Sequence, residues 1–196
     1  TIFLNLGNEE SALVWYEKAL AKDNNYAPAI NNLANIKRLS GDIQESIDLY
    51  KQAIQADSKL IQAYVGAALS FLALGDLDQA AVFAGQALEM NEGAPGVNEI
   101  LGIIYQNKGN PDQAITCYEK ELEVNPRASN SLLNLGLLFL DKGENAVAVE
   151  SLEKASSLAP SEQCSVLLAQ AYQNLGQFKG ALIAYKKLNL HQSMNK

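Results

Sequence analysis

A glycine recurs along this chain at a nearly constant interval. The intervals between its occurrences are 34, 34, 34, 34 and 33 residues. The glycines are Gly7, Gly41, Gly75, Gly109, Gly143 and Gly176. A fixed period of this length indicates a repeat architecture, in which each unit buries its apolar face against its neighbours. The chain is therefore expected to fold as stacked copies of one small unit.

The residues around each glycine keep the same phase. Five positions after it stands a small residue, and nine positions after it stands a large one in every repeat except where Ala84 replaces it. On both sides of the glycine, apolar residues recur every three or four positions, which is the spacing of one helix face. Glycine at the turn can end the first helix in the left-handed conformation. Each unit is therefore predicted to be a helical hairpin.

The fourth repeat shows the pattern most completely. It contains Leu101-Gly102, Tyr105, Ala114, Tyr118 and Pro126. This pattern resembles that of the tetratricopeptide repeat (TPR) family, whose unit is a helix–turn–helix of about 34 residues. The resemblance implies an all-α fold, a right-handed TPR superhelix that is an α-solenoid of antiparallel helix pairs. It says little about function, because one fold serves many partners.

The repeats predict a single solenoid over residues 1–190, followed by a polar tail, 191–196, that we expect to fray. The predicted repeats are 1–26, 27–60, 61–94, 95–128, 129–161 and 162–190. The first repeat lacks half of its first helix, and no polar capping helix follows the last. We therefore expect either a segment of a longer protein or a chain whose open ends pair with another copy.

Core positions follow from helical periodicity. With the turn glycine as position 15, the core face of the third repeat holds Tyr64, Ala67, Ala68 and Phe71. A small residue at position 8 should leave room for the large residue at position 24 of the same repeat. Glu121 stands at a position that is usually small and buried, and with Ala84 it suggests looser packing nearby. Asn or Asp after the turn glycine should cap the second helix.

Composition excludes several classes of protein. The chain has 15 basic and 22 acidic residues and a net charge of −7, and its basic residues are spread thinly, so we expect no nucleic-acid binding. Apolar runs are too interrupted for membrane insertion. No signal peptide is visible, although the chain starts at Thr1, and a cytoplasmic location is favoured. Cys117 and Cys164 are expected to be buried, reduced thiols.

Catalytic chemistry finds no support in the sequence. The only histidine is His191, in the polar tail, which argues against histidine-based triads and metal sites. No phosphate-binding or dinucleotide-binding glycine motif is present. Glu119, Glu121 and Glu123 are best interpreted as parts of a solvated helix face. We therefore predict that the chain is not an enzyme and uses no cofactor or metal.

The resemblance implies where a partner would bind. In TPR proteins the side of the first helices that faces away from the core lines a concave groove. The groove positions are predicted to be Asn31, Asn35, Arg38, Val65, Leu69, Leu72, Glu99, Ile103, Gln106, Leu133, Leu137 and Leu140, followed by Gln170 and Gln173. The groove thus begins polar and is apolar in its middle. It lacks the Lys, Asn and Arg set of carboxylate-binding TPR domains, and an asparagine ladder would fit only Asn32 and Asn134.

These features predict a non-catalytic protein–protein interaction scaffold that binds a peptide or amphipathic helix in an apolar groove. One alternative is that the chain is the recruiting segment of a larger enzyme, such as a glycosyltransferase or sulfotransferase. Another is a homo-oligomer that assembles through the open solenoid ends. A third interpretation of the apolar groove positions is that a tight superhelix, a neighbouring chain or a missing segment covers them.

Overall fold

The computed structural model describes the chain over residues 9–194, and its side chains over residues 13–186. This part contains eleven helices and no strand, so the predicted all-α class is confirmed. Expectations about Gly7, the half helix before it, and the last two residues lie outside the described residues.

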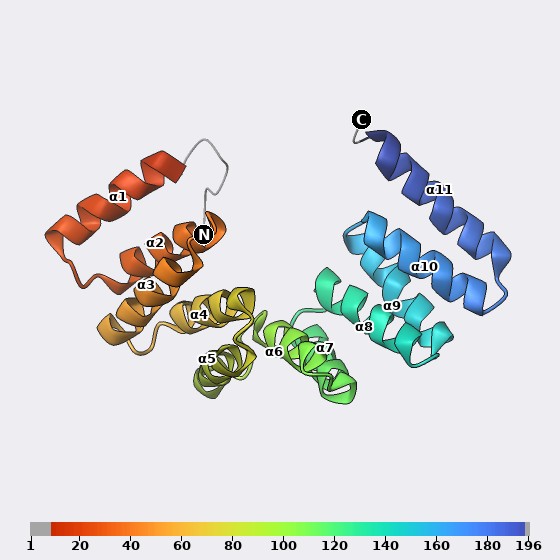
Figure 1. The fold of residues 1–196 in the computed structure, drawn as a ribbon, viewed down its shortest axis with the longest axis horizontal. Helices are drawn as coiled ribbons and strands as arrows, with labels where there is room; N and C mark the ends of the chain where they lie inside the picture. The colour runs from red at the N-terminus through yellow and green to blue at the C-terminus, as the bar shows by residue number, and fades with distance from the viewer. Residues whose placement is uncertain (1–8, 195–196) are drawn as a thin grey trace. The chain divides into compact units, whose positions relative to one another are not determined.

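The helices follow one another as hairpins (Figure 1). Their bounds are α1 (Glu9–Lys22), α2 (Ala27–Leu39), α3 (Ile43–Ala56), α4 (Ile61–Leu74), α5 (Leu77–Met90), α6 (Val97–Asn107), α7 (Pro111–Val124), α8 (Ser129–Asp141), α9 (Asn145–Leu158), α10 (Glu162–Asn174) and α11 (Phe178–Met194). Helix α11 extends beyond Leu190, where we expected the last repeat to end. The six repeat boundaries stay a prediction.

Helix α6 begins later than its repeat suggests. The fourth repeat was expected to start at Pro95, whereas α6 starts at Val97. Between them Gly96 has φ of 83°, which lies outside the helical region and stops the helix from extending towards the N-terminus. The segment 91–96 is consequently an irregular loop.

The helices form two compact units, Thr1–Ile100 and Leu101–Lys196, and the division falls inside α6. In unit 1, α2 packs against α3, α3 against α4, and α4 against α5. In unit 2, α8 packs against α9, α9 against α10, and α10 against α11. Each unit thus consists of helical hairpins stacked on their neighbours.

The turns show which sequence signals decide local structure. Gly75 and Gly109 have φ of 79° and 73°, as predicted for glycines that end the first helices. At the start of the second helices, Asp76 accepts a hydrogen bond from the backbone N–H of Gln79 at 3.1 Å. The same prediction is wrong for Asn110, whose side chain caps nothing.

Asp42 and Glu144 likewise make no side-chain cap. Asp42 instead pairs with Lys37 at 3.7 Å, an ion pair that competes for the carboxylate. The residue after the turn glycine therefore indicates a tendency to cap the second helix, but it does not decide whether a given helix is capped.

The core of each unit is built from interlocking small and large residues. In unit 1 the buried cluster holds Ile30, Ala34, Tyr50, Ala53, Ala63 and Ala67. In unit 2 the buried clusters include Leu132, Leu152, Leu168, Tyr118, Leu135 and Leu138. A Cβ added at Gly102 would lie 2.5 Å from the Tyr118 ring, and one at Gly136 would lie 2.4 Å from Leu152. The predicted pairing of positions 8 and 24 is confirmed.

Two expectations need correction, for Glu121 and for Cys117. Glu121 is buried, with 1% of its surface exposed, so the interpretation as a solvated face holds only for Glu119 and Glu123. Cys164 is buried, and its Sγ lies 3.3 Å from the carbonyl oxygen of Leu152, whereas Cys117 is only half-buried. Both cysteines are free thiols.

Ala84 stands where other repeats carry a large residue, and its neighbour Phe83 partly fills the space. The Phe83 ring stacks on Phe71 at a centroid distance of 5.3 Å. An aromatic side chain at the adjacent position thus supplies packing that the sequence pattern did not predict.

Candidate functional site

The predicted groove residues lie on α2, α4, α6 and α8, and we call the surface that they form the first-helix face. In unit 1, Asn35 and Arg38 of α2 and Val65, Leu69 and Leu72 of α4 are half-buried. Leu69 and its neighbours therefore expose part of their side chains to solvent.

The remaining unit 1 positions are Asn31 and Glu99. Glu99 is half-buried, and Asn31 is buried with 6% of its surface exposed. Asn31 is covered because α4 packs against α2. The Asn31 side chain therefore lies at the edge of the first-helix face and is largely shielded from solvent.

A pocket of about 340 Å³ opens on the first-helix face of unit 1. It joins three of the predicted residues, Asn35, Val65 and Leu69, to the loop between α5 and α6. Its complete lining is Asn35, Ile61, Gln62, Val65, Gly66, Leu69, Asn91, Ala94 and Pro95. The lining combines apolar side chains with three amide side chains, Asn35, Gln62 and Asn91, and amide groups can both donate to and accept from a peptide backbone.

Glycine at position 66 gives this pocket its shape. A Cβ there would lie 2.2 Å from the ring of Tyr50, so the ring packs directly on the helix backbone. The Tyr50 hydroxyl then reaches α2 and donates to Oδ1 of Asn35 at 2.7 Å. Burial raises the pKa of Tyr50, and a hydrogen bond with the Arg38 guanidinium opposes that rise.

Two polar atoms of α2 make no hydrogen bond within the described part of the chain. They are Oδ1 of Asn31 and Nε of Arg38, and both atoms are buried. A buried polar atom without a partner costs roughly 1–3 kcal/mol.

Unit 2 carries the rest of the predicted positions. Ile103, Gln106, Leu133 and Leu137 are half-buried. Gln106 accepts a hydrogen bond from the Tyr118 hydroxyl at 3.0 Å, an arrangement like that of Asn35 and Tyr50 in unit 1. Leu133 also lines a smaller pocket of about 240 Å³ between α8, α9 and the start of α10.

Leu140 is a correction to the predicted site. It is buried, with 9% of its surface exposed, and it belongs to the same core cluster as Leu132 and Cys164. The reason is that α10 packs against α8 and covers the end of that helix. By contrast, Gln170 and Gln173 of α10 are exposed.

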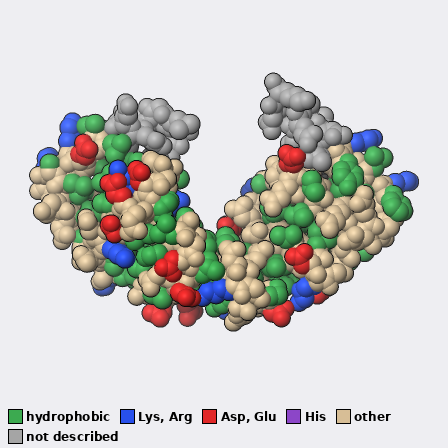
Figure 2. Space-filling model, in the orientation of Figure 1, with side chains coloured by type: hydrophobic (Ala, Val, Ile, Leu, Met, Phe, Trp, Pro, Cys, Tyr) green, Lys and Arg blue, Asp and Glu red, His purple; other side chains and the backbone are tan. Residues whose placement is uncertain are grey.

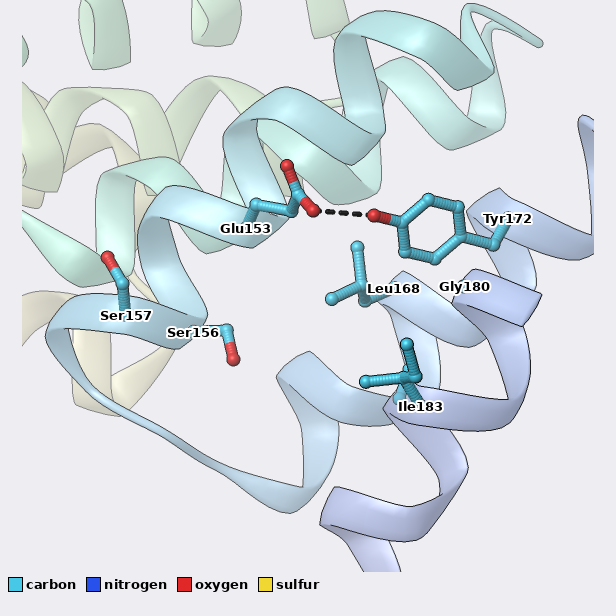
Figure 3. Close-up of a pocket in the computed structure, with 8 residues that line it drawn as sticks. Glu153, Ser156, Ser157, Leu168, Tyr172, Gly180 and Ile183 are labelled. Atoms are coloured by element: carbon cyan, nitrogen blue, oxygen red, sulfur yellow. Dashed lines mark hydrogen bonds between the residues drawn. The ribbon is translucent and has the colours of Figure 1, made fainter. Parts of the chain in front are cut away.

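The sequence interpretation missed a third pocket, lined by α9, α10 and α11 (Figure 3). Its volume is about 230 Å³, and it lies away from the first-helix face of α8. The sequence feature that could have indicated this pocket is Ser156, because the preceding repeats carry Leu or Ile at that position.

The charges and metal-binding potential of the described residues agree with an interaction surface. Acidic and basic side chains are scattered between hydrophobic ones on the face shown in Figure 2. Within residues 13–186, no group of three or more His, Cys, Asp or Glu side chains is placed to hold a metal ion. None of the described helices combines the length and apolar character needed to cross a membrane.

Comparison with known families agrees with this architecture. A family model described as "Tetratricopeptide repeat" matches residues 27–60. A model of "Anaphase-promoting complex, cyclosome, subunit 3" matches residues 107–188. These matches and the eleven described helices are consistent with about six tetratricopeptide repeats. None of the curated proteins matches the sequence.

Solved structures share the fold at low sequence identity. The pilF protein of Pseudomonas aeruginosa has a TM-score of 0.84 at 19% identity, with 96% of this chain and 90% of that chain covered. The hetero-tetramer Cut9–Hcn1 of the anaphase-promoting complex has a TM-score of 0.80 at 18% sequence identity. The match covers 94% of this chain but only 37% of that chain. YrrB is described as "a TPR protein with an unusual peptide-binding site". It has a TM-score of 0.67 at 18% sequence identity, and the match covers 88% of this chain and 90% of that chain.

Proposed function

We propose that this chain is a non-catalytic interaction scaffold that binds a peptide or an amphipathic helix on its first-helix face. The observation that carries the proposal is the pocket of about 340 Å³ in unit 1, which joins Asn35, Val65 and Leu69. Its apolar side chains would contact a side chain of the partner, and its amide side chains would bond to the partner's backbone.

The apolar residues supply the free energy of binding. Full burial of a Leu or Val side chain contributes about 1.5–3 kcal/mol, so burying the exposed half of one contributes roughly 1 kcal/mol. The first-helix face offers such residues in both units, among them Leu72, Ile103 and Leu137. Association costs are large, and we therefore expect affinities of about micromolar.

The polar atoms supply orientation. The amide groups of Gln62 and Asn91, which are exposed and line the pocket, could exchange hydrogen bonds with the backbone of the partner. Such bonds favour one register of the bound segment because each amide group has a fixed direction.

Two structural relatives support the class of partner. The YrrB structure is described as having a peptide-binding site, and Cut9–Hcn1 is a hetero-tetramer. Both are below 25% identity, so they suggest a protein or peptide ligand without naming one. The same surface would serve if the chain recruits substrates for a larger enzyme.

The test is capture of partners from the protein's own cell extract with the wild-type chain, Leu69→Glu and Leu137→Glu. Val82→Glu is the matched control, because Val82 is 51% exposed on α5 and lies outside the first-helix face. We expect the first two variants to lose partners that the control retains, with melting temperatures close to wild type. Partners retained by all variants would contradict the proposal.

Self-assembly is a second candidate, and a specific observation favours it. On α11, Phe178 is 74% exposed, Leu182 56% and Ile183 59%, which is a concentration of large apolar side chains on one helix. Sedimentation over a range of concentrations tests this candidate. A wild-type oligomer that dissociates in Leu182→Glu would support self-assembly, and a monomer at high concentration would exclude it.

A further inference from the structure

The pocket between α9, α10 and α11, which we call the α9–α11 pocket, differs in kind from the first-helix face. Helix α9 lies on one side of it, α10 forms its floor and α11 lies on the other side (Figure 3). The lining residues are Glu153, Ser156, Ser157, Leu168, Tyr172, Gly180, Ile183 and Ala184. All eight belong to unit 2, so the pocket is complete within one compact unit.

The pocket exists because Ser156 departs from the repeat pattern. The position thirteen residues after the turn glycine is Leu20, Ile54, Leu88 and Leu122 in the first four repeats. Leu122 fills the corresponding space in the preceding repeat, where it packs against the core clusters of unit 2. Serine is smaller by several heavy atoms and leaves that space open in the fifth repeat.

Glycine at position 180 is the second departure. None of the five earlier repeats carries glycine at this position, where they have Ser11, Glu45, Gln79, Gln113 and Val147. A Cβ at Gly180 would lie 2.7 Å from the ring of Tyr172, so only glycine lets that ring lie against α11. The Tyr172 hydroxyl then donates to Oε1 of Glu153 at 2.5 Å and holds the carboxylate at the rim of the pocket (Figure 3).

The polar part of the pocket favours a cation. Glu153 is the one charged side chain among the lining residues within the described side chains, 13–186. The last turn of α9 lies beside it, and the unsatisfied carbonyl groups of a helix C-terminus carry partial negative charge. The neighbouring Lys154 is bonded to Glu150 at 2.8 Å, and Lys179 and Lys186 of α11 are exposed without lining the pocket.

The apolar part favours a long stem. Leu168, Ile183 and Ala184 form a hydrophobic surface below the rim. The volume of 230 Å³ exceeds the roughly 150 Å³ that holds a benzene molecule in an engineered cavity, so one large side chain fits. The hydroxyl of Ser156 lines the same space and makes no hydrogen bond to the described chain, so it can accept one from a ligand.

We propose that the α9–α11 pocket binds an arginine side chain of a protein partner. The aliphatic stem packs on Leu168 and Ile183, and the guanidinium donates to Glu153 and to the Ser156 hydroxyl. A carboxylate has about four acceptor sites, so the bond from Tyr172 leaves room for a forked arginine. The planar guanidinium can also stack on the Tyr172 ring, which an ammonium group does less well. This site is independent of the first-helix face.

The probe for testing this proposal is the N-acetyl methylamide of arginine, titrated into methyl-labelled protein and followed by NMR. Its neutral isostere, the same derivative of citrulline, is titrated at matched ionic strength. A ligand this small should bind with about millimolar affinity. We expect saturable shifts of the Leu168, Ile183 and Ala184 methyl signals with arginine, and roughly threefold to tenfold weaker binding of citrulline.

Three variants decide whether the pocket is responsible. Ser156→Leu restores the residue type of the other repeats and should abolish the shifts without lowering the melting temperature. Glu153→Gln keeps an oxygen for Tyr172 and should weaken arginine binding by roughly threefold to tenfold. Glu150→Gln removes a carboxylate on the same helix outside the pocket and should change nothing.

Any of three outcomes overturns the proposal. Equal binding of arginine and citrulline would show that charge plays no part. Shifts that persist in Ser156→Leu would place the binding elsewhere on this acidic chain. Absence of saturable shifts at these methyl groups would show that the pocket does not take the side chain.

Discussion

The pocket on the first-helix face of unit 1 and the α9–α11 pocket of unit 2 have a common origin and different chemistry. Each is lined by residues smaller than the repeat pattern requires: Gly66, on which the Tyr50 ring packs, in one, and Ser156 with Gly180, on which the Tyr172 ring packs, in the other. The first has the amide side chains of Asn35, Gln62 and Asn91, whereas the second has a carboxylate, Glu153, at its rim.

The difference shows how a repeat protein can acquire separate binding sites on one fold. Residues that follow the pattern fill the core and fix the stacking, so they carry little information about ligands. Residues that break the pattern cost packing, and in this chain they leave pockets with different polar groups. The four predictions below act on these departures.

The largest expected effect comes from placing a serine in the fourth repeat, at the position that Ser156 occupies in the fifth. Leu122→Ser removes a side chain that packs against both core clusters of unit 2. We expect a loss of about 3 kcal/mol in the free energy of unfolding, the usual size for deletion of a large aliphatic side chain. Urea denaturation measures it, and Val124→Ser, at a residue that is 40% exposed, is the control. A loss of less than about 1 kcal/mol would mean that this position does not support the core.

Overpacking the pocket of unit 1 should have the next largest effect. In Gly66→Ala the new Cβ would meet the Tyr50 ring at 2.2 Å, and that ring is fully buried and bonded to Asn35. We expect a loss of about 2 kcal/mol, typical of an overfilled core. The matched control is Gly85→Ala in α5, where a Cβ meets nothing within 4 Å. That variant should gain about 0.5–1 kcal/mol from helix propensity, and equal effects of the two variants would contradict the packing described for Tyr50.

Filling the α9–α11 pocket should stabilise the chain. In Ser156→Leu an aliphatic side chain enters a space lined by Leu168 and Ala184. We expect a gain of about 1 kcal/mol, less than full burial because the pocket is open to solvent. The melting temperature should rise by roughly 2–4 °C for a chain of this size. A fall in melting temperature would indicate that Ser156 has a structural role that the pocket geometry does not show.

The smallest effect concerns alkaline pH. The hydrogen bond to Glu153, followed by burial and the carboxylate charge, raises the pKa of Tyr172 to about 12 from 10.0. The neutral phenol therefore stabilises the fold fully below pH 10, and this contribution is lost as the pH rises from about 10 to about 12. Burial also raises the pKa of Tyr50, so ultraviolet titration of tyrosine ionisation should show one late group fewer in Tyr172→Phe than in wild type. An equal number of late groups in the two proteins would contradict the assignment to Tyr172.

Much of the fold could be predicted from the sequence because the repeat combines independent local signals. Turn glycines such as Gly75, helix periodicity, and the pairing of Gly102 with Tyr118 all point to the same hairpin. Burial of individual side chains was less predictable. Leu140 and Glu121 lie in the core because of packing between helices, which periodicity within one helix does not report.

The pockets could not be predicted from the repeat pattern, because they form at positions where the chain departs from that pattern. Ser156 is an ordinary helix residue until it is compared with Leu122 and Ile54 at the same position. Likewise, the late start of α6 at Val97 places Ala94 and Pro95 at the rim of the unit 1 pocket. The shape of the unit 1 pocket thus depends on how α2, α4 and the loop 91–96 are arranged together.

The most direct test of the central claim is the affinity of peptides selected from a random library against the wild-type chain. Fluorescence anisotropy then compares wild type, Leu69→Glu and Leu137→Glu, with Val82→Glu as the exposed control. The account predicts that selected peptides bind wild type and the control alike. It also predicts that they lose about tenfold or more of their affinity in Leu69→Glu, Leu137→Glu or both, as expected when a buried apolar contact becomes a charge. Equal affinity for all four proteins would show that the first-helix face is not the binding surface.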